Sequence, residues 1–182
     1  MDFTPIPNPS AFPLACPSFP YWGGMDVLER EWNRTSAFAS EDPGSSQHTE
    51  YIFWRNVSVI WTCATIEAFV NEEGAGWVGA HWYKKTIERG RIDEKILLVY
   101  ALKYRKLLPI NSPALKRINQ LFQRRGELVH PKATSPRSES NESESPPVFA
   151  PSEFSEFRKV FWELTALFEP SGDGEEKEIA NQ

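Results

Sequence analysis

The chain of 182 residues has little cysteine and no long apolar run, and each absence excludes a class of protein. Its two cysteines, Cys16 and Cys63, lack the spacing of metal ligands, which excludes a disulfide scaffold and a zinc finger. No apolar run approaches the roughly 20 residues of a membrane span, so we expect no association with a membrane. The first residues lack the basic and apolar stretches of a secretory signal, and we expect a cytoplasmic protein.

Several motifs that bind phosphate or activate a nucleophile are also missing. The sequence contains no P-loop, no Rossmann glycine pattern and no nucleophile elbow. Because metal-ligand spacing is absent as well, we predict no metal site and no cofactor.

The charge of the chain is distributed unevenly. Its formal net charge is -5, yet residues 84–132 hold thirteen Lys and Arg against four Asp and Glu. The remainder holds seven basic and twenty-one acidic residues. A partner that carries phosphate would be attracted to the middle of the chain and repelled by its ends. The alternative is that solvated helix faces cluster charge by chance.

Composition divides the chain into one domain with three irregular segments. Residues 1–23 contain six prolines among several aromatic residues, which predicts an extended segment that lies across the domain. Residues 132–151 are rich in Ser, Glu and Pro, which predicts a disordered loop. Residues 170–182 form an acidic tail. The domain itself is expected over residues 24–169.

Apolar residues within this domain recur at helical spacing, and no segment has a convincing strand pattern. We therefore predict an all-α fold, an antiparallel helical bundle of about four main helices plus short extra helices. The predicted helices cover residues 24–39, 51–73, 81–89, 91–108, 112–130 and 152–169. Residues 41–48 are expected to form a loop, and Gly74 and Gly76 are expected to end the long central helix.

Two charged residues interrupt the apolar faces of these helices. Arg125 lies four residues after Leu121 and four before Val129, and Glu67 lies between Cys63 and Val70 in the same way. A charge on an apolar face needs a partner or a ligand, so we predict that Arg125 and Glu67 pair with each other. This pair has a purely structural interpretation, as an ion pair inside a bundle.

His130 ends the helix that carries Arg125, and the spacing of the two residues gives a resemblance to a known family. A lone histidine at a helix end more often caps the last carbonyls than takes part in catalysis. Here, however, Arg125 and His130 form an R-x4-H pattern, in the run RRGELVHP. This pattern resembles the R-x4-6-H signature of the HEPN superfamily of small helical bundles. The earlier segment TIEAFVNE, which contains Glu67, is similar to the segment where many members carry an acidic residue.

The resemblance covers residues 24–169 as an order of helices, and it departs from the family at one position. The polar residue that commonly follows the motif Arg is Gly126 here. If Arg124 is taken as the motif Arg, the spacing becomes five and Arg125 occupies the polar position. Both spacings lie within the range of the family.

The resemblance implies a metal-independent endoribonuclease that works as a homodimer, with two motifs facing one cleft. RNA supplies the 2′-hydroxyl nucleophile, so DNA is not cut. His130 would move the proton, Arg125 would hold the phosphate oxygens, and Glu67 would orient one of the two. Arg124 and Lys132 are expected to bind the RNA. The resemblance also implies a role in toxin–antitoxin or antiviral defence, with an antitoxin or a nucleotidyltransferase as a possible partner.

Two other functions remain open at this point. The first is a non-catalytic HEPN-like module that binds RNA, a nucleotide or a protein. The second is a plain helical interaction protein, in which Arg125→Ala would cost about 3 to 5 kcal/mol if it left Glu67 buried and unpaired. On an ideal helix, Arg125 and His130 point about 140° apart, so one face cannot present both. Pro131 disfavours helical geometry at His130, and a dimer could combine one residue from each chain.

Overall fold

The computed structural model describes residues 22–130 and 151–169, and these residues form helices and no strand. The all-α prediction is therefore confirmed for the described part of the chain. The acidic tail at 170–182 lies outside the described residues, as does the predicted loop at 132–151 apart from Pro151. The predicted extended segment 1–23 also lies outside them except for Trp22 and Gly23, which begin the first helix instead.

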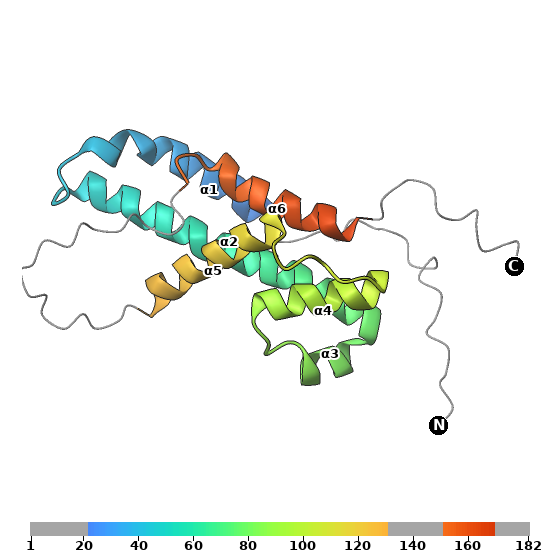
Figure 1. The fold of residues 1–182 in the computed structure, drawn as a ribbon. Helices are drawn as coiled ribbons and strands as arrows, with labels where there is room; N and C mark the ends of the chain where they lie inside the picture. The colour runs from blue at the N-terminus through green and yellow to red at the C-terminus, as the bar shows by residue number, and fades with distance from the viewer. Residues whose placement is uncertain (1–21, 131–150, 170–182) are drawn as a thin grey trace, which may run out of the picture.

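Five α-helices of thirteen residues or more make up most of the described fold, one more than the approximate number expected. They are α1 (Trp22–Thr35), α2 (Ser46–Val78), α4 (Ile92–Tyr104), α5 (Pro113–Val129) and α6 (Ser155–Phe168). The short 3₁₀ helix η2 (Ser36–Ser40) and the short helix α3 (Ala80–Thr86) complete the order (Figure 1).

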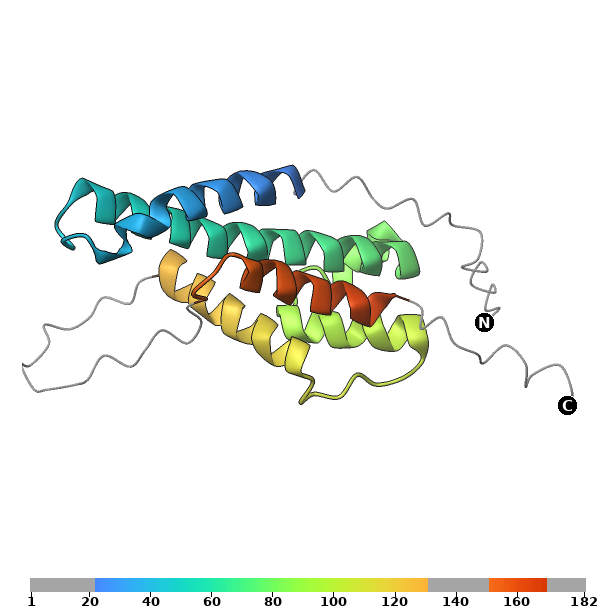
Figure 2. The ribbon, with the colours of Figure 1, turned by 90° about the horizontal axis from the view of Figure 1, so that it is seen from above.

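Helix α2 is the element around which the others are arranged. It is 33 residues long and packs against α1, α3, α4, α5 and α6. Figure 1 shows α5 crossing the middle of α2, and Figure 2 shows α1 and α6 lying along it. The prediction of a long and central helix is therefore confirmed. Side chains on three different helices can meet at the middle of α2, which is where the candidate site lies.

Both ends of α2 differ from the prediction. The helix begins at Ser46, because the Ser45 side chain caps it by accepting a hydrogen bond from His48 N at 3.1 Å. It also continues through Gly74 and Gly76, which we expected to end it. Gly79 ends it instead, with a φ of 85° that a residue with a side chain rarely adopts.

The ends of the later helices are also shifted. Helix α4 ends at Tyr104 rather than at 108, because Arg105 adopts the left-handed conformation with a φ of 52°. Helix α5 begins at Pro113 as expected, but the Ser112 side chain makes no capping hydrogen bond. Helix α6 begins at Ser155, so the predicted cap at Ser152 was wrong.

The core consists of the apolar stripes that the helical spacing predicted. The stripe of α6 is fully buried and contains Phe154, Phe157, Phe161, Leu164 and Phe168. Helix α2 is less buried than expected, since Ile52, Phe53 and Ile60 remain exposed on one of its sides. Exposed side chains of this size leave one face of the central helix without an apolar neighbour among the described residues.

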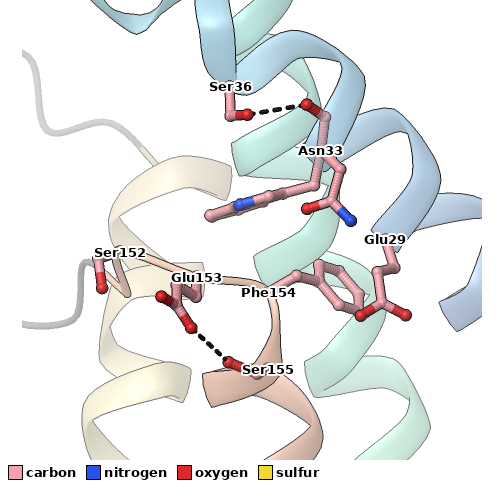
Figure 3. A pocket seen from close by; sticks show the side chains of 8 residues that line it. Glu29, Asn33, Ser36, Ser152, Glu153, Phe154 and Ser155 are labelled. Atoms are coloured by element: carbon pink, nitrogen blue, oxygen red, sulfur yellow. Dashed lines mark hydrogen bonds between the residues drawn. The ribbon is translucent and has the colours of Figure 1, made fainter.

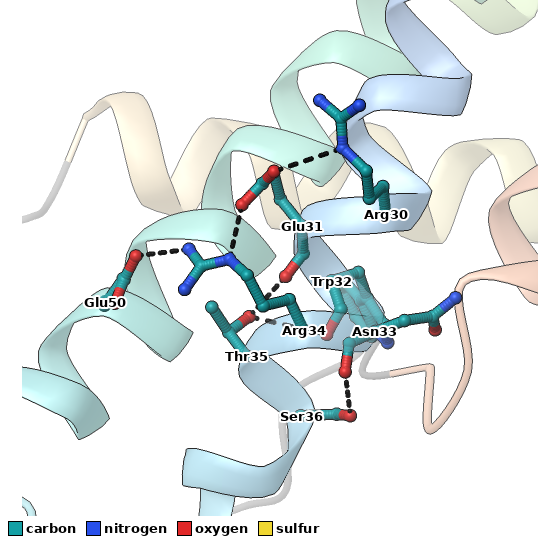
Figure 4. Close-up of polar contacts among 8 residues, drawn as sticks. All are labelled: Arg30, Glu31, Trp32, Asn33, Arg34, Thr35, Ser36 and Glu50. Carbon is teal, nitrogen blue, oxygen red and sulfur yellow. Dashed lines mark hydrogen bonds and ion pairs between the residues drawn. The ribbon is translucent and has the colours of Figure 1, made fainter.

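Polar contacts fix α1 against the start of α2. The Arg34 guanidinium contacts Glu31 on its own helix at 2.7 Å and also bonds to Glu50 of α2 (Figure 4). The hydrogen bond from Arg34 lowers the pKa of the Glu31 carboxyl, so this carboxyl stays ionised. In the last turn of α1, the Thr35 hydroxyl donates to the Glu31 carbonyl at 2.8 Å. The contacts orient the α1–α2 pair and lie far along α2 from the candidate site.

Candidate functional site

Three helices bring a carboxylate and two cations together at the middle of the fold. Glu67 of α2 lies between Lys95 of α4 and Arg125 of α5. The Lys95 Nζ donates to Glu67 Oε1 at 3.0 Å, and Arg125 NH1 lies 3.6 Å from Glu67 Oε2. The structure therefore contains the predicted Arg125–Glu67 pair. It adds Lys95, which sequence reasoning missed.

Lys95 is the buried member of this cluster, with a side chain that is only 1% exposed. Its ammonium also donates to Asn71 Oδ1 at 3.3 Å, and the Tyr83 hydroxyl donates to the same oxygen at 2.9 Å. Burial raises the pKa of Tyr83 to about 12, so its hydroxyl remains protonated and can donate. The ring of Tyr83 packs against Gly74, where a Cβ would lie 2.1 Å from it. Gly74 therefore allows Tyr83 to reach this polar cluster.

Arg125 is exposed, in contrast to the prediction that it projects into a buried face. Its side chain is 40% exposed and that of Glu67 is 36% exposed. The guanidinium lies over the Phe122 ring, 5.9 Å from the centroid, and makes no hydrogen bond to any described residue. Because a guanidinium carries five N–H donors, most of them remain available to a ligand from solvent.

Cys63 lies beneath the cluster and is chemically inert. Its side chain is buried, and its Sγ lies 3.7 Å from the Leu121 carbonyl oxygen. Burial raises the pKa of the Cys63 thiol to about 12, against a smaller opposite effect of Arg125. The thiol is therefore protonated at neutral pH and is not a candidate nucleophile.

His130 lies at the end of α5, where the chain leaves helical geometry. It is the C-terminal cap, exposed, with φ −125° and ψ 68°. Relative to a helical φ, its side chain is turned by about 60° around the N–Cα bond. The imidazole makes no hydrogen bond to any residue that the structure describes, and it contacts neither Arg125 nor Glu67. One chain thus brings Arg125 and Glu67 together but leaves His130 apart from them.

The remaining predicted site residues differ in what the structure says of them. Arg124 is paired on its own helix with Glu127, at 3.2 Å. Lys132 lies outside the described residues. Gly126 is exposed, and a Cβ added there would meet no atom within 4 Å.

Two surface hollows lie away from this cluster. One of about 310 Å³ lies between α1 and the start of α6, lined by Trp32, Asn33 and Phe154 among others (Figure 3). Another of about 310 Å³ is lined by Tyr100, Tyr104 and neighbouring residues. Neither contains a member of the Glu67 cluster. The Glu67 cluster is therefore an open surface site rather than a pocket.

Two further findings concern the described residues as a whole. Nowhere in residues 22–130 and 151–169 do three or more His, Cys, Asp or Glu side chains gather as a metal ion would require. No helix in these ranges is long and apolar enough to cross a membrane.

Comparisons with protein-family models, with curated proteins and with solved structures found no match to this chain. Inferences about function therefore come from the residues of the cluster and from the motif resemblance.

Lys95 could have been found from the sequence. It lies three residues after Ile92 and four before Val99, both of which are buried. The same test of spacing that singled out Arg125 applies to it.

Proposed function

We propose that this chain is a HEPN-like antiparallel helical bundle that cuts RNA as a metal-independent endoribonuclease. The observation that supports the proposal best is the contact between Glu67 and Arg125, which are 58 positions apart in sequence. They come from the two short segments that carry the resemblance. A motif that arose by chance would have no reason to place its arginine on that carboxylate.

The chemistry requires two groups besides the RNA. The 2′-oxygen attacks the neighbouring phosphorus, forming one P–O bond while the bond to the 5′-oxygen breaks. His130 takes the proton of the 2′-hydroxyl, a proton is delivered to the leaving 5′-oxygen, and the product is a cyclic phosphate. Arg125 holds the phosphate oxygens with two of its N–H groups, and its charge stabilises the phosphorane. Glu67 orients Arg125. Arg124 and Lys132 hold the flanking phosphates.

The site is proposed to be shared between two copies of the chain. In one copy His130 contacts neither Arg125 nor Glu67, so a partner copy would complete the site. Phe53, Ile60 and Glu67 are spaced seven residues apart, which aligns them along one side of α2. Phe53 is 56% exposed and Ile60 is 40% exposed. This apolar line leads to the candidate site and would be covered in a homodimer.

The biological setting is proposed from the resemblance. A ribonuclease of this kind would act in the cytoplasm, in toxin–antitoxin or antiviral defence. An antitoxin or a nucleotidyltransferase would then keep it inactive. The basic balance of residues 84–132, which includes α4 and α5, suits an RNA substrate.

The test is cleavage of labelled RNA and of matched DNA in the presence of EDTA. We expect cutting of RNA alone, cyclic phosphate ends, and complete loss of cutting in His130→Ala. His48→Ala is the matched control, because His48 lies about 28 Å from Glu67 along α2. Circular dichroism checks that each variant is folded. Cutting that survives in His130→Ala, or that extends to DNA, would overturn the mechanism.

The second candidate is a non-catalytic module that binds RNA, a nucleotide or a protein through Arg125. The presence of Gly126 at the position that is polar in the family favours it. A folded wild-type protein that binds RNA but does not cut it would support this candidate. In that case Arg125→Ala should weaken binding while His130→Ala should not.

A further inference from the structure

The charges of the Glu67 cluster do not balance. One carboxylate faces two cations, Lys95 and Arg125. The neighbouring Arg124 has its own partner in Glu127, at 3.2 Å. The cluster therefore has a surplus positive charge, and an anion from outside would complete it.

The geometry indicates which of the two cations is satisfied by the carboxylate. Lys95 donates a hydrogen bond to Glu67 at 3.0 Å and is 1% exposed, so it has no access to water as an alternative partner. A buried ammonium requires its counter-ion, whereas an exposed guanidinium is hydrated and does not. Arg125 lies at 3.6 Å, is 40% exposed and makes no hydrogen bond to Glu67. The carboxylate therefore belongs mainly to Lys95.

We propose that Lys95 is a positioning residue: by pairing with Glu67 it leaves Arg125 the surplus charge with which the site binds a phosphate group. This inference rests on the proposed function for the identity of the ligand, an RNA phosphate. Without Lys95, Glu67 would face Arg125 alone, and the two would neutralise each other. Asn71 and Tyr83 support Lys95 by fixing its ammonium from the other side.

Lys95→Met is the variant that tests this inference. Methionine has a similar volume and suits a buried position, so the fold should survive. Binding is measured with a fluorescent 2′-O-methyl RNA oligonucleotide, which cannot be cut. We expect Lys95→Met to weaken binding about fivefold, the factor that corresponds to one exposed ion pair. The double variant Lys95→Met/Glu67→Gln removes both charges, frees Arg125 again, and should restore binding to near the wild-type level.

Lys103 provides a matched control on the same helix. Its ammonium also pairs with a carboxylate of α2, since it contacts Glu73 at 2.9 Å, and its side chain is 14% exposed. Lys103→Met therefore removes one charge and one ion pair between α4 and α2, away from Arg125. It should leave RNA binding unchanged.

A second measurement does not depend on RNA. Phenylglyoxal modifies accessible guanidinium groups, and mass spectrometry gives the extent of labelling at each arginine. Labelling of Arg125 should fall in Lys95→Met and recover in Lys95→Met/Glu67→Gln. Arg117 serves as the internal reference, because it pairs with Glu163 at 3.2 Å on the same helix α5.

The outcomes separate this inference from the proposed function. Unchanged binding and labelling in a folded Lys95→Met protein would overturn it. Weakened binding that the double variant fails to restore would also overturn it, because Lys95 would then act by another route. If the wild-type protein binds no RNA, the proposed function fails, and the labelling alone decides whether Lys95 leaves Arg125 free.

Discussion

Replacing Glu67 by glutamine should destabilise the fold through Lys95, and not through Arg125. Lys95 is 1% exposed, and Glu67 is the carboxylate that it contacts. The neutral amide would leave a buried ammonium without a counter-charge, and a stranded buried charge costs about 3 to 5 kcal/mol. The new amide keeps an oxygen that can accept a hydrogen bond. We therefore expect a loss near the lower value, about 3 kcal/mol.

Arg125→Ala should cost much less, about 1 kcal/mol or below. The pair that it breaks is 3.6 Å long, with side chains that are 40% and 36% exposed, and exposed pairs contribute little. Sequence reasoning assigned the large loss to this variant, on the assumption that Glu67 is buried and has no other partner. The structure changes the expectation because Glu67 is partly exposed and keeps Lys95.

Urea unfolding followed by circular dichroism gives the free energy of unfolding of each variant. The double variant Glu67→Gln/Lys95→Met should recover most of the 3 kcal/mol, since the stranded charge is then gone. In thermal melts the Glu67→Gln loss should lower the Tm by about 6 to 12 °C. The reasoning is refuted if Arg125→Ala costs as much as Glu67→Gln, or if the double variant is no more stable than Glu67→Gln.

Three further predictions concern alkaline pH and the glycines. Burial raises the pKa of Cys63 from 9.0 to about 12 and that of Tyr83 from 10.0 to about 12, so both groups favour folding in their protonated forms. Their stabilisation is complete below pH 9 and is lost as the pH rises toward 12. For Cys63 this loss is up to about 1.4 kcal/mol per pH unit; urea unfolding between pH 8 and 11 measures it, and Cys63→Ala should flatten the dependence. Gly74→Ala should lower stability by about 1 to 3 kcal/mol because its Cβ would lie 2.1 Å from the Tyr83 ring, whereas Gly76→Ala, with open space around it, should raise stability by about 1 kcal/mol in the same melts. Gly126→Asn places the family's polar residue where no atom lies within 4 Å, so it should fold normally and raise the rate of RNA cutting; an unchanged rate would show that Gly126 does not limit activity.

Much of the fold was predictable because helical spacing reports burial directly. The stripe from Phe154 to Phe168 on α6 is buried as expected. Helix ends were less predictable, since glycine ends a helix only where the backbone turns left-handed. Gly79 has such a conformation, with a φ of 85°. Gly74 is a glycine for a different reason, the close approach of Tyr83.

The candidate site was predictable in part. The pair of Arg125 and Glu67 could be inferred, because each interrupts an apolar line of its helix. Its exposure could not, because Ile60, on the same line as Glu67, is 40% exposed rather than buried. Lys95 was missed because lysine usually keeps its ammonium in water and buries only its aliphatic stem. Spacing alone does not distinguish that arrangement from full burial.

The burial of Lys95 also determines how the site should vary among related sequences. Because the ammonium and the Glu67 carboxylate depend on each other, a relative that loses one should lose the other and carry apolar or neutral residues at both positions. The two positions are separated by 28 residues and should therefore covary. Arg125, which solvent can satisfy, is free to change without them. An alignment in which Arg125 is nevertheless retained would reflect selection for its ligand rather than for the fold.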